Sequence, residues 1–241
     1  MPTGLAVFDR PWLRANFLPE VAQELEPGAF LDIGCHLGVH LQPFSQRAWN
    51  CVGVDIDAEA LRTAEKYGRV HLRNGEEPLS FLADESFDVV NAYNLFHHVK
   101  DVEGTLKEAL RCLKPGGYLL ISENVENGLF LRLGRNIFSK WEGMPVCSRM
   151  HVQEWLGLLS QHPVKIMAMF VRSQYREIPW TMLFFVSVVP IVGPWARKSF
   201  ADSFRNHRGN AKLHRHAGAK DDFKGIQKVV FVLQKQLEPA G

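Results

Sequence analysis

The sequence predicts an α/β fold in which a parallel sheet carries helices on both faces. Between residues 29 and 123, apolar runs of strand length alternate with amphipathic segments of helical period. This alternation is typical of parallel sheets with helical crossovers. The first apolar run, Ala29 to Ile33, leads into a glycine-containing turn and then an amphipathic segment. That order is typical of the first strand, turn and helix of a nucleotide-binding unit.

Length and composition fit one globular domain with room for an insertion. The chain has 241 residues and a formal net charge of +2, so its charge alone does not indicate nucleic-acid binding. The first residues lack the basic and then apolar pattern of a secretory signal. The cysteines lack C-x-x-C spacing, and we interpret them as reduced, mostly buried thiols of a cytoplasmic protein, with no bound metal expected. They are Cys35, Cys51, Cys112 and Cys147.

The first half of the chain gives the following elements in order. Residues 11–25 predict a helical lead-in interrupted by Pro19, and residues 29–33 predict the first strand. A helix is expected next, with Leu37, Leu41 and Phe44 on one face. A second strand over 51–54 ends at Asp55, and Asp57 is the expected N-cap of a helix over 58–67. Residues 70–72 predict a short third strand.

The second half continues the alternation. Residues 87–90 predict a fourth strand, and residues 91–98 the loop beyond its carboxyl end. Asp101 is the expected cap of a helix whose apolar residues follow i, i+3, i+4, i+7 spacing. The stretch 114–117 predicts a turn into a fifth strand over 118–123.

The glycine turn after the first strand does not fit a dinucleotide fingerprint. Counting from Gly34, His36 takes the place of the second glycine of G-x-G-x-x-G, and Gly38 comes one place too late. Asp32 would also bring a carboxylate close to phosphate charge. An acid at this position favours a ligand that carries an ammonium group and no phosphate, which argues against a dehydrogenase.

The pattern Asp32-x-Gly34-x-His36-x-Gly38 resembles motif I of the class I S-adenosylmethionine-dependent methyltransferases, with His36 in place of the middle glycine. The run S-F-D-V-V, L-F-H-H-V and E-A-L-R-C-L-K-P-G-G-Y-L-L-I, from residue 86 to residue 121, resembles the same family. The two blocks span residues 29–123. The resemblance implies a Rossmann-like, seven-stranded, mostly parallel sheet whose last strand is antiparallel. Residues 164–171 and 229–233 fit the last two strands, with a helix expected over 152–160 before them.

The resemblance also implies S-adenosyl-L-methionine as the cofactor and suggests which residues hold it. Asp32 would position the methionine end, and the turn would cradle it. Asp55 would accept hydrogen bonds from the ribose hydroxyls, with Ile56 packed on the adenine. Asn74 and Gly75 would meet the adenine edge, with Glu76 as an alternative, and Asn91 would approach through its backbone. The full predicted cofactor set is Asp32, Gly34, Cys35, His36, Gly38, Asp55, Ile56, Asn74, Gly75 and Asn91.

A general base for the acceptor is expected among polar residues in loops on the carboxyl side of the sheet. We predict His97, His151 and Tyr93 as the catalytic candidates, with Glu123 also in reach of the cleft. A histidine suits proton removal near neutral pH. Of the adjacent pair, we assign a structural role to His98 and the chemistry to His97.

An insertion separates the last two predicted strands. We divide the chain into a lead-in (1–28), a methyltransferase core (29–171), an insertion (172–227) and a final strand with its tail (228–241). Residues 178–195 are almost wholly apolar, contain three prolines and are followed by a basic stretch. We expect residues 178–198 to contact a membrane surface peripherally, or else to cover the active site or a second subunit. His207, His214 and His216 are expected in a solvated loop.

Together these features predict transfer of a methyl group to a small-molecule or lipid-linked acceptor, with O-methylation favoured. The alternative is a non-catalytic protein of the same fold that binds a membrane or a protein partner. Nucleic acid is disfavoured as a partner because Asn91-Ala92-Tyr93-Asn94 lacks the prolines of the N-P-P-Y motif of amino-methylating nucleic-acid enzymes.

Overall fold

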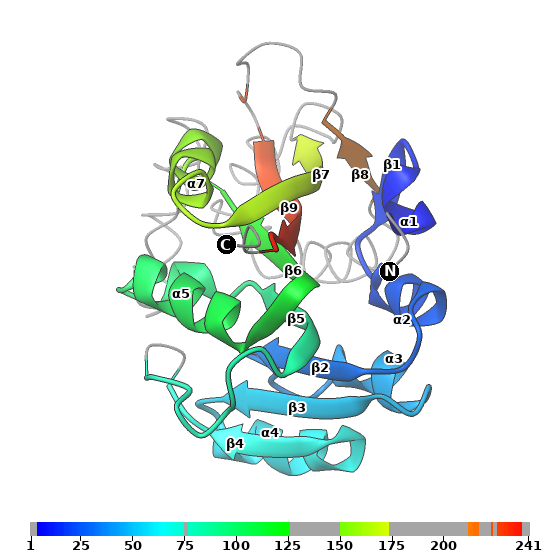
Figure 1. Cartoon of the computed structure of the whole chain (residues 1–241), viewed down its shortest axis with the longest axis vertical. Coiled ribbons are helices and arrows are strands. Elements are labelled where there is room, and N and C mark those ends of the chain that lie inside the picture. The colour runs from blue at the N-terminus through cyan, green and yellow to red at the C-terminus, as the bar shows by residue number, and fades with distance from the viewer. Residues whose placement is uncertain are drawn as a thin grey trace, which may run out of the picture.

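The computed structural model describes residues 4–74, 77–125, 150–173, 212–216, 223 and 226–237. These residues form one sheet of nine strands in the order β1-β8-β7-β9-β6-β5-β2-β3-β4 (Figure 1). The strands are β1 (Trp12–Arg14), β2 (Ala29–Ile33), β3 (Asn50–Asp55), β4 (Arg69–Leu72), β5 (Phe87–Tyr93), β6 (Leu113–Asn124), β7 (Val164–Ser173), β8 (Lys212–Arg215) and β9 (Ile226–Lys235). The α-helices are α1 (Ala6–Asp9), α2 (Leu18–Glu24), α3 (Leu41–Ser45), α4 (Ala58–Ala64), α5 (Val102–Cys112) and α7 (Val152–Leu159), and the 3₁₀ turns are η1 (Glu65–Tyr67) and η2 (Phe96–His98).

The predicted Rossmann-like sheet is confirmed. Strands β4, β3, β2, β5 and β6 are parallel neighbours. Strand β9 lies between β6 and β7 and is antiparallel to both, as expected for the last strand of this fold. Parallel strands place their carboxyl ends at one edge of the sheet, and open α/β sheets bind ligands at that edge.

The two strands beyond the predicted seven lie at the far edge of the sheet. The helix predicted over residues 11–25 is wrong at its start, because Trp12–Arg14 forms β1 and helix α2 covers only Leu18–Glu24. Strand β1 pairs with β8, and Leu13 lies opposite Leu213 with both side chains buried. The pairing partner is about 200 residues away in the sequence, so local periodicity could not reveal it.

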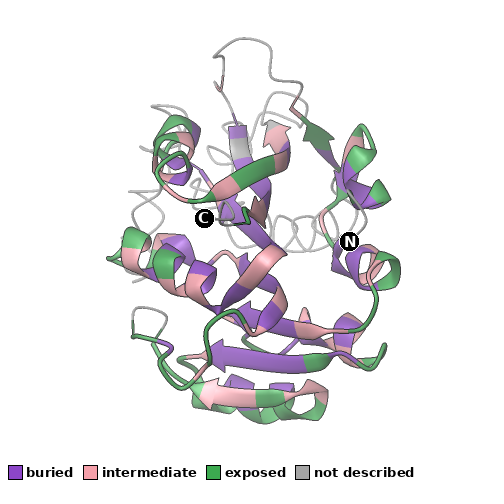
Figure 2. Ribbon diagram, in the orientation of Figure 1, coloured by how far each residue is buried: buried purple, intermediate pink, exposed green. Residues whose placement is uncertain are grey.

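Helices cover both faces of the sheet, each over its own apolar core. Residues from α5 and α7 pack with Leu31 and Ile33 on one face. Residues from α1, α2, α3 and α4 pack with Phe30 on the other. The alternation along β2 reflects the period of two in a strand, and the central strands are buried on both sides (Figure 2).

Both predicted caps are confirmed. Asp57 accepts backbone hydrogen bonds from Glu59 and Ala60 at the start of α4, and Asp101 accepts one from Gly104 at the start of α5. The helix after the glycine turn, however, begins at Leu41, and Leu37 lies outside it with 42% of its surface exposed. Residues 36–40 form a turn instead.

Asp88 and Lys114, from the second block of family resemblance (residues 86–121), form contacts at the edge of the sheet where the parallel strands begin. Asp88 accepts the backbone N–H of Ala29 at 2.8 Å and also binds the Nζ atom of Lys114 at 2.8 and 2.9 Å. A Cβ atom on Gly28 would lie 2.4 Å from the Asp88 carboxylate, so a larger residue there would displace that side chain. The turn predicted over 114–117 lies inside β6, which starts at Leu113.

The described part of the predicted insertion contains β8. His214 belongs to this strand, so its placement in a solvated loop is wrong, while His207 and the apolar run 178–195 lie outside the described residues. Lys212 of the basic stretch lies over the ring of Trp12, with 4.5 Å between Nζ and the ring centroid. Among the described residues, no helix is long and apolar enough to cross a membrane.

Candidate active site

A left-handed turn follows β2 at the carboxyl edge of the sheet. Gly34, His36 and Gly38 have φ angles of 80°, 45° and 75°. The backbone N–H of His36 donates to Asp55 Oδ2 at 2.7 Å, and that of Asp57 donates to Oδ1 at 2.9 Å. The Asp55 carboxylate therefore fixes the turn after β2 to the end of β3, beside the position expected for a ribose.

The substitution of His36 for the family glycine leaves the turn intact. His36 adopts the positive φ that glycine adopts most readily, and this conformation costs a non-glycine residue on the order of 1 kcal/mol. The Cys35 side chain points away from the edge. Its Sγ atom lies against Gly53 of β3, so that a Cβ atom added to Gly53 would be only 2.7 Å from it. Gly38 is packed against α4, where a Cβ would meet Ala64 at 2.9 Å. The described structure thus gives Cys35 and Gly38 packing roles.

Burial shields the Cys35 thiol from solvent and raises its pKa, and the nearby Asp32 and Asp55 carboxylates raise it further. Burial likewise raises the pKa of Cys51 to about 12 and that of Cys112 to about 11. All three are free, buried thiols, as the sequence predicts. Cys147 lies outside the described residues.

Asp32 is the most deeply buried acid at this edge, with 0% of its surface exposed. Its Oδ1 atom accepts a hydrogen bond from Asn91 Nδ2 at 2.6 Å, and its Oδ2 atom has no hydrogen-bond partner. The Nδ1 atom of His40 lies 3.6 Å from Oδ2, beyond hydrogen-bond distance. A buried carboxylate oxygen without a donor is costly unless a ligand or water supplies one.

Asn91 lies in β5 and not in the loop that the sequence predicts, because β5 continues to Tyr93. Its side chain is 1% exposed and holds Asp32 in place. This side-chain contact lies beneath the site, and the expected approach of Asn91 to a cofactor through its backbone stays a prediction.

The remaining predicted cofactor residues lie at the ends of β3 and β4. Ile56 follows β3 and is 69% exposed, so its side chain is open to a ligand. Asn74 follows β4 and is exposed, and its carbonyl accepts the backbone N–H of Glu77 at 3.0 Å. Gly75 and Glu76 lie outside the described residues.

These residues fit S-adenosylmethionine. The unpartnered Asp32 oxygen suits the ammonium of a methionine, the Asp55 carboxylate suits a ribose diol, and Ile56 offers an apolar face to a base. Gly34 leaves room for close approach, with only Leu95 near a Cβ placed there, at 3.3 Å. Among the described residues, no group of three or more His, Cys, Asp or Glu side chains could hold a metal ion.

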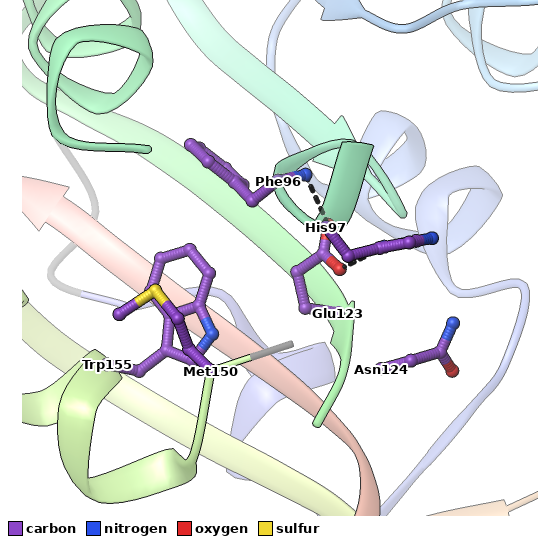
Figure 3. Close-up of a pocket in the computed structure, with 6 residues that line it drawn as sticks. All are labelled: Phe96, His97, Glu123, Asn124, Met150 and Trp155. Atoms are coloured by element: carbon purple, nitrogen blue, oxygen red, sulfur yellow. Dashed lines mark hydrogen bonds and ion pairs between the residues drawn. The ribbon is translucent and has the colours of Figure 1, made fainter. Parts of the chain in front are cut away.

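A histidine–carboxylate pair lies farther along the same edge, between η2 and the end of β6. The Oε2 atom of Glu123 lies 2.7 Å from Nδ1 of His97, and Oε1 accepts the backbone N–H of Phe96 at 2.8 Å. Glu123 is 1% exposed. Because a carboxylate only accepts, Nδ1 carries the imidazole proton and Nε2 is the basic nitrogen. The far nitrogen of the ring points away from Glu123 (Figure 3).

The pair borders a cavity of about 10 Å³, which has room for about one water molecule. It is lined by Phe96, His97, Glu123, Asn124, Met150 and Trp155 (Figure 3).

His98, for which a structural role is predicted, is exposed, and its ring centroid lies 4.1 Å from that of His97. The other two predicted bases, His151 and Tyr93, belong to other elements. His151 is the exposed N-cap of α7, and its backbone N–H donates to Glu154 at 2.7 Å. Tyr93 ends β5, between the ring of His40 at 4.6 Å and Lys228 Nζ, which lies 3.9 Å from its ring centroid.

Sequence reasoning missed His40 and Lys228. His40 lies six residues after Gly34 and is brought to Asp32 by the turn. Lys228 directly precedes the apolar run Val229–Leu233 of β9, and a charge at that position was the available signal.

The fold and this edge define a protein class: a nucleotide-cofactor-binding α/β protein with an acid at the end of each of two adjacent central strands. Residues 31–121 match the family model described as a methyltransferase domain. This part of the chain is thus similar to a methyltransferase domain.

Relatives support this assignment. The chain is 27% identical over 131 residues to a ubiquinone biosynthesis O-methyltransferase from Bordetella avium, covering 51% of this chain and 54% of that protein. It is 29% identical over 154 residues to the enzyme of the same name from Idiomarina loihiensis, covering 60% of this chain and 57% of that protein. The chain spans about half the length of the curated relatives it matches.

Solved structures show the same fold. An S-adenosylmethionine-dependent methyltransferase from Methanosarcina mazei aligns with a TM-score of 0.57 and 20% identity, covering 89% of this chain and 95% of that one. A geranyl diphosphate methyltransferase, solved in complex with GPP and sinefungin, aligns with a TM-score of 0.60 and 15% identity, covering 92% of this chain and 77% of that one.

Proposed function

We propose that this protein transfers a methyl group from S-adenosylmethionine to an oxygen atom of a small-molecule acceptor. The observation that carries the proposal is the buried, unpartnered Oδ2 atom of Asp32, on the strand next to the one that ends at Asp55. When bound, the cofactor supplies a methyl group activated by a sulfonium. The residues of the chain then bind and orient the acceptor and take up its proton.

In the proposed site, Asp32 and the turn from Gly34 hold the methionine end. Asp55 accepts from the ribose, Ile56 covers one face of the adenine, and Asn74 meets its edge. This arrangement leaves the ends of β5 and β6 for the acceptor, because those strands lie beyond Asp32 in the sheet order.

The proposed base is His97, through its Nε2 atom. An acceptor hydroxyl must lose its proton as it becomes methylated, and a positioned histidine is suited to take it. Glu123 fixes the tautomer and stabilises the positive charge that His97 acquires, since it lies 2.7 Å from Nδ1. O-methylation is further supported by the names of the relatives from Bordetella avium and Idiomarina loihiensis.

The test is a thermal-shift titration with S-adenosylmethionine, S-adenosylhomocysteine and NAD. A ligand present at a hundredfold excess over its Kd stabilises the native state by about 2.7 kcal/mol. We expect both sulfur compounds to raise Tm and NAD to leave it unchanged. Asp55→Ala should abolish the shift, while the control Asp57→Ala removes only the α4 cap and should lower Tm with the shift retained.

A titration without any shift for the sulfur compounds would overturn the proposal. It would favour the non-catalytic alternative, in which the fold serves to bind a membrane or a protein.

A lipid-linked acceptor and peripheral membrane contact through residues 178–198 are the finer part of the proposal. They are supported by the apolar run 178–195 and the basic residues after it in the sequence. Liposome flotation of the full chain and of a variant lacking residues 178–196 tests this part. Equal flotation of the two proteins would overturn it and leave the methyl-transfer proposal untouched.

A further inference from the structure

A row of polar side chains crosses one face of the sheet just inside its carboxyl edge. It begins at Asp32 on β2 and continues through adjacent strands in register, as the pairs Asp32–Asn91, Tyr93–Ser122, Asn124–Lys228 and Arg172–Lys228. All these side chains lie on the sheet face covered by α1–α4, because each is two or four residues along its strand from a residue of that core. The core residues are Phe30, Val89, Leu120, Val230 and Phe170.

Four members of this row have a buried polar atom without a hydrogen-bond partner. They are Asp32 Oδ2, Asn91 Oδ1, Ser122 Oγ and Arg172 Nε. Native proteins leave few buried polar atoms unpaired, and a group of them usually marks a place where a ligand or water completes the hydrogen bonds.

Lys228 is the cation on β9, in the half of the row farther from Asp32, and it lies between Asn124 on β6 and Arg172 on β7. It is 6% exposed, and its Nζ atom donates to Asn94 Oδ1 at 3.2 Å. The ammonium also lies 3.9 Å from the centroid of the Tyr93 ring. Asn124 Nδ2 donates to the same Asn94 oxygen at 3.2 Å, so Asn94 is shared by two donors.

Arg172 lies directly opposite Lys228 on β7. Side chains at opposed positions of an antiparallel pair have Cβ atoms about 5 Å apart, and like charges there are destabilising. Burial lowers the pKa of Lys228 and Arg172 lowers it further, while Tyr93 and Glu123 act in the opposite direction. Among the described residues, no carboxylate forms an ion pair with Lys228. In the part of the chain that the structure describes, Arg172 likewise has no carboxylate in ion-pair contact, so these two opposed cations share no bound anion there.

We propose that Lys228 and Arg172 bind an anionic oxygen group of the methyl acceptor, such as a phenolate or a carboxylate. The inference rests on the proposed methyl transfer and narrows its substrate class to acidic oxygen compounds. An anion between the two side chains relieves their repulsion and receives charge-assisted hydrogen bonds. Tyr93 offers an aromatic wall on the side toward His40 and Asp32.

The probe is 4-nitrophenol, which ionises near neutral pH and absorbs at a longer wavelength when ionised. It is titrated into the full chain saturated with S-adenosylhomocysteine, and benzoate is used as a competitor. We expect the bound probe to be ionised at a lower pH than the free one. We expect Lys228→Met and Arg172→Met each to weaken nitrophenolate binding by about tenfold or more.

The matched control is Lys235→Met. Lys235 is a second partly buried lysine on β9, but it lies at the opposite edge, where its Nζ atom donates to the carbonyls of Leu110 and Leu113. This variant should bind nitrophenolate like the wild type. Displacement by benzoate shows that a carboxylate occupies the same site, and failure to displace restricts the site to phenolates.

Equal nitrophenolate affinity of the wild type and Lys228→Met would overturn the inference, as would the absence of binding of both anions to the wild type. Folding of each variant is verified by its thermal shift with S-adenosylhomocysteine. Loss of that shift in the wild type is a failure of the proposed function itself. Its retention without a Lys228-dependent anion site is a failure of this inference alone.

Discussion

His97 Nδ1 lies 2.7 Å from Glu123 Oε2, so a buried acid holds one side of the imidazole and leaves the other for chemistry. The same carboxylate accepts the N–H of Phe96, which fixes η2 to the end of β6. One residue therefore positions both the loop and the ring that the loop carries.

For His97→Gln we expect turnover of an acceptor found in a phenol screen to fall by about 10²- to 10⁴-fold, because a positioned base is lost. S-adenosylhomocysteine should still raise Tm, since the cofactor residues are unchanged. The measurement is single-turnover methyl transfer. The neighbouring His98→Gln variant is the control and should keep its rate, because His98 is exposed. Equal rates for wild type and His97→Gln would exclude His97 as the base.

Glu123→Gln should change the tautomer of His97. A neutral amide can donate to the imidazole as well as accept from it, so Nδ1 loses its fixed proton. We expect ¹⁵N NMR of the imidazole to show Nδ1–H in the wild type and a mixture in the variant. The free energy of unfolding should fall by about 1–3 kcal/mol, because buried donors lose a charged acceptor. A spectrum unchanged by the substitution would contradict this role of Glu123.

Asp32→Asn should weaken S-adenosylhomocysteine binding by about tenfold or more, because the charge that faces the ligand ammonium is removed. The same variant should unfold at an equal or higher denaturant concentration, since it neutralises a buried oxygen without a donor. Calorimetric titration and urea unfolding measure the two effects. Asp57→Asn keeps a good helix cap and serves as the control. Wild-type affinity in Asp32→Asn would refute the proposed contact.

Asp88→Ala should lower the free energy of unfolding by about 1–3 kcal/mol, because the Ala29 N–H and Lys114 lose a charged acceptor. Affinity for S-adenosylhomocysteine should be unchanged, since Asp88 lies at the opposite edge of the sheet from the site. Urea unfolding with an unchanged m-value measures the loss. Asp84→Ala, which removes an exposed carboxylate paired with Arg111, should cost about 1 kcal/mol or less.

Because of Glu108, the free energy of unfolding should depend on pH under acidic conditions. Its hydrogen bond with Arg111 holds its pKa below the ordinary value of 4.5, although burial opposes the shift. The stabilisation is therefore present above pH 4.5 and is lost as the pH falls through the lower, folded-state pKa. The Tm difference between the wild type and Glu108→Gln should be constant near neutrality and shrink below pH 4.5. A difference that is independent of pH would contradict the assignment.

The features that sequence predicts well are local. Asp57 and Asp101 precede helices whose N–H groups they accept, and both ends of each contact lie within three residues. The left-handed turn at Gly34 likewise depends on residues that are adjacent in the sequence. Strand β1 depends on residues 212–214, and three residues alone carry no pattern that separates a strand from a helix.

The missed site residues depend on register. Lys228 is in an apolar run, and nothing in that run says that Arg172 and Asn124 lie opposite it. Sequence placed His97 and Glu123 on the same edge, but their contact depends on how β5 and β6 align. The sequence predicts where the strands end. Which side chains form pairs across neighbouring strands depends on the order and register of the strands in the sheet.

The position of β9 has a consequence for how the protein folds. β9 fills the space between β6 and β7, so β6 has an unpaired edge until residues 226–235 leave the ribosome. Asp32 and Asp55 belong to strands made early, whereas the contact between Asn94 and Lys228 joins residues 134 positions apart. Contacts of such separation form late and slowly. An incompletely folded chain would thus acquire its cofactor residues first and its cationic pair last, with the edge of β6 exposed to misassociation meanwhile.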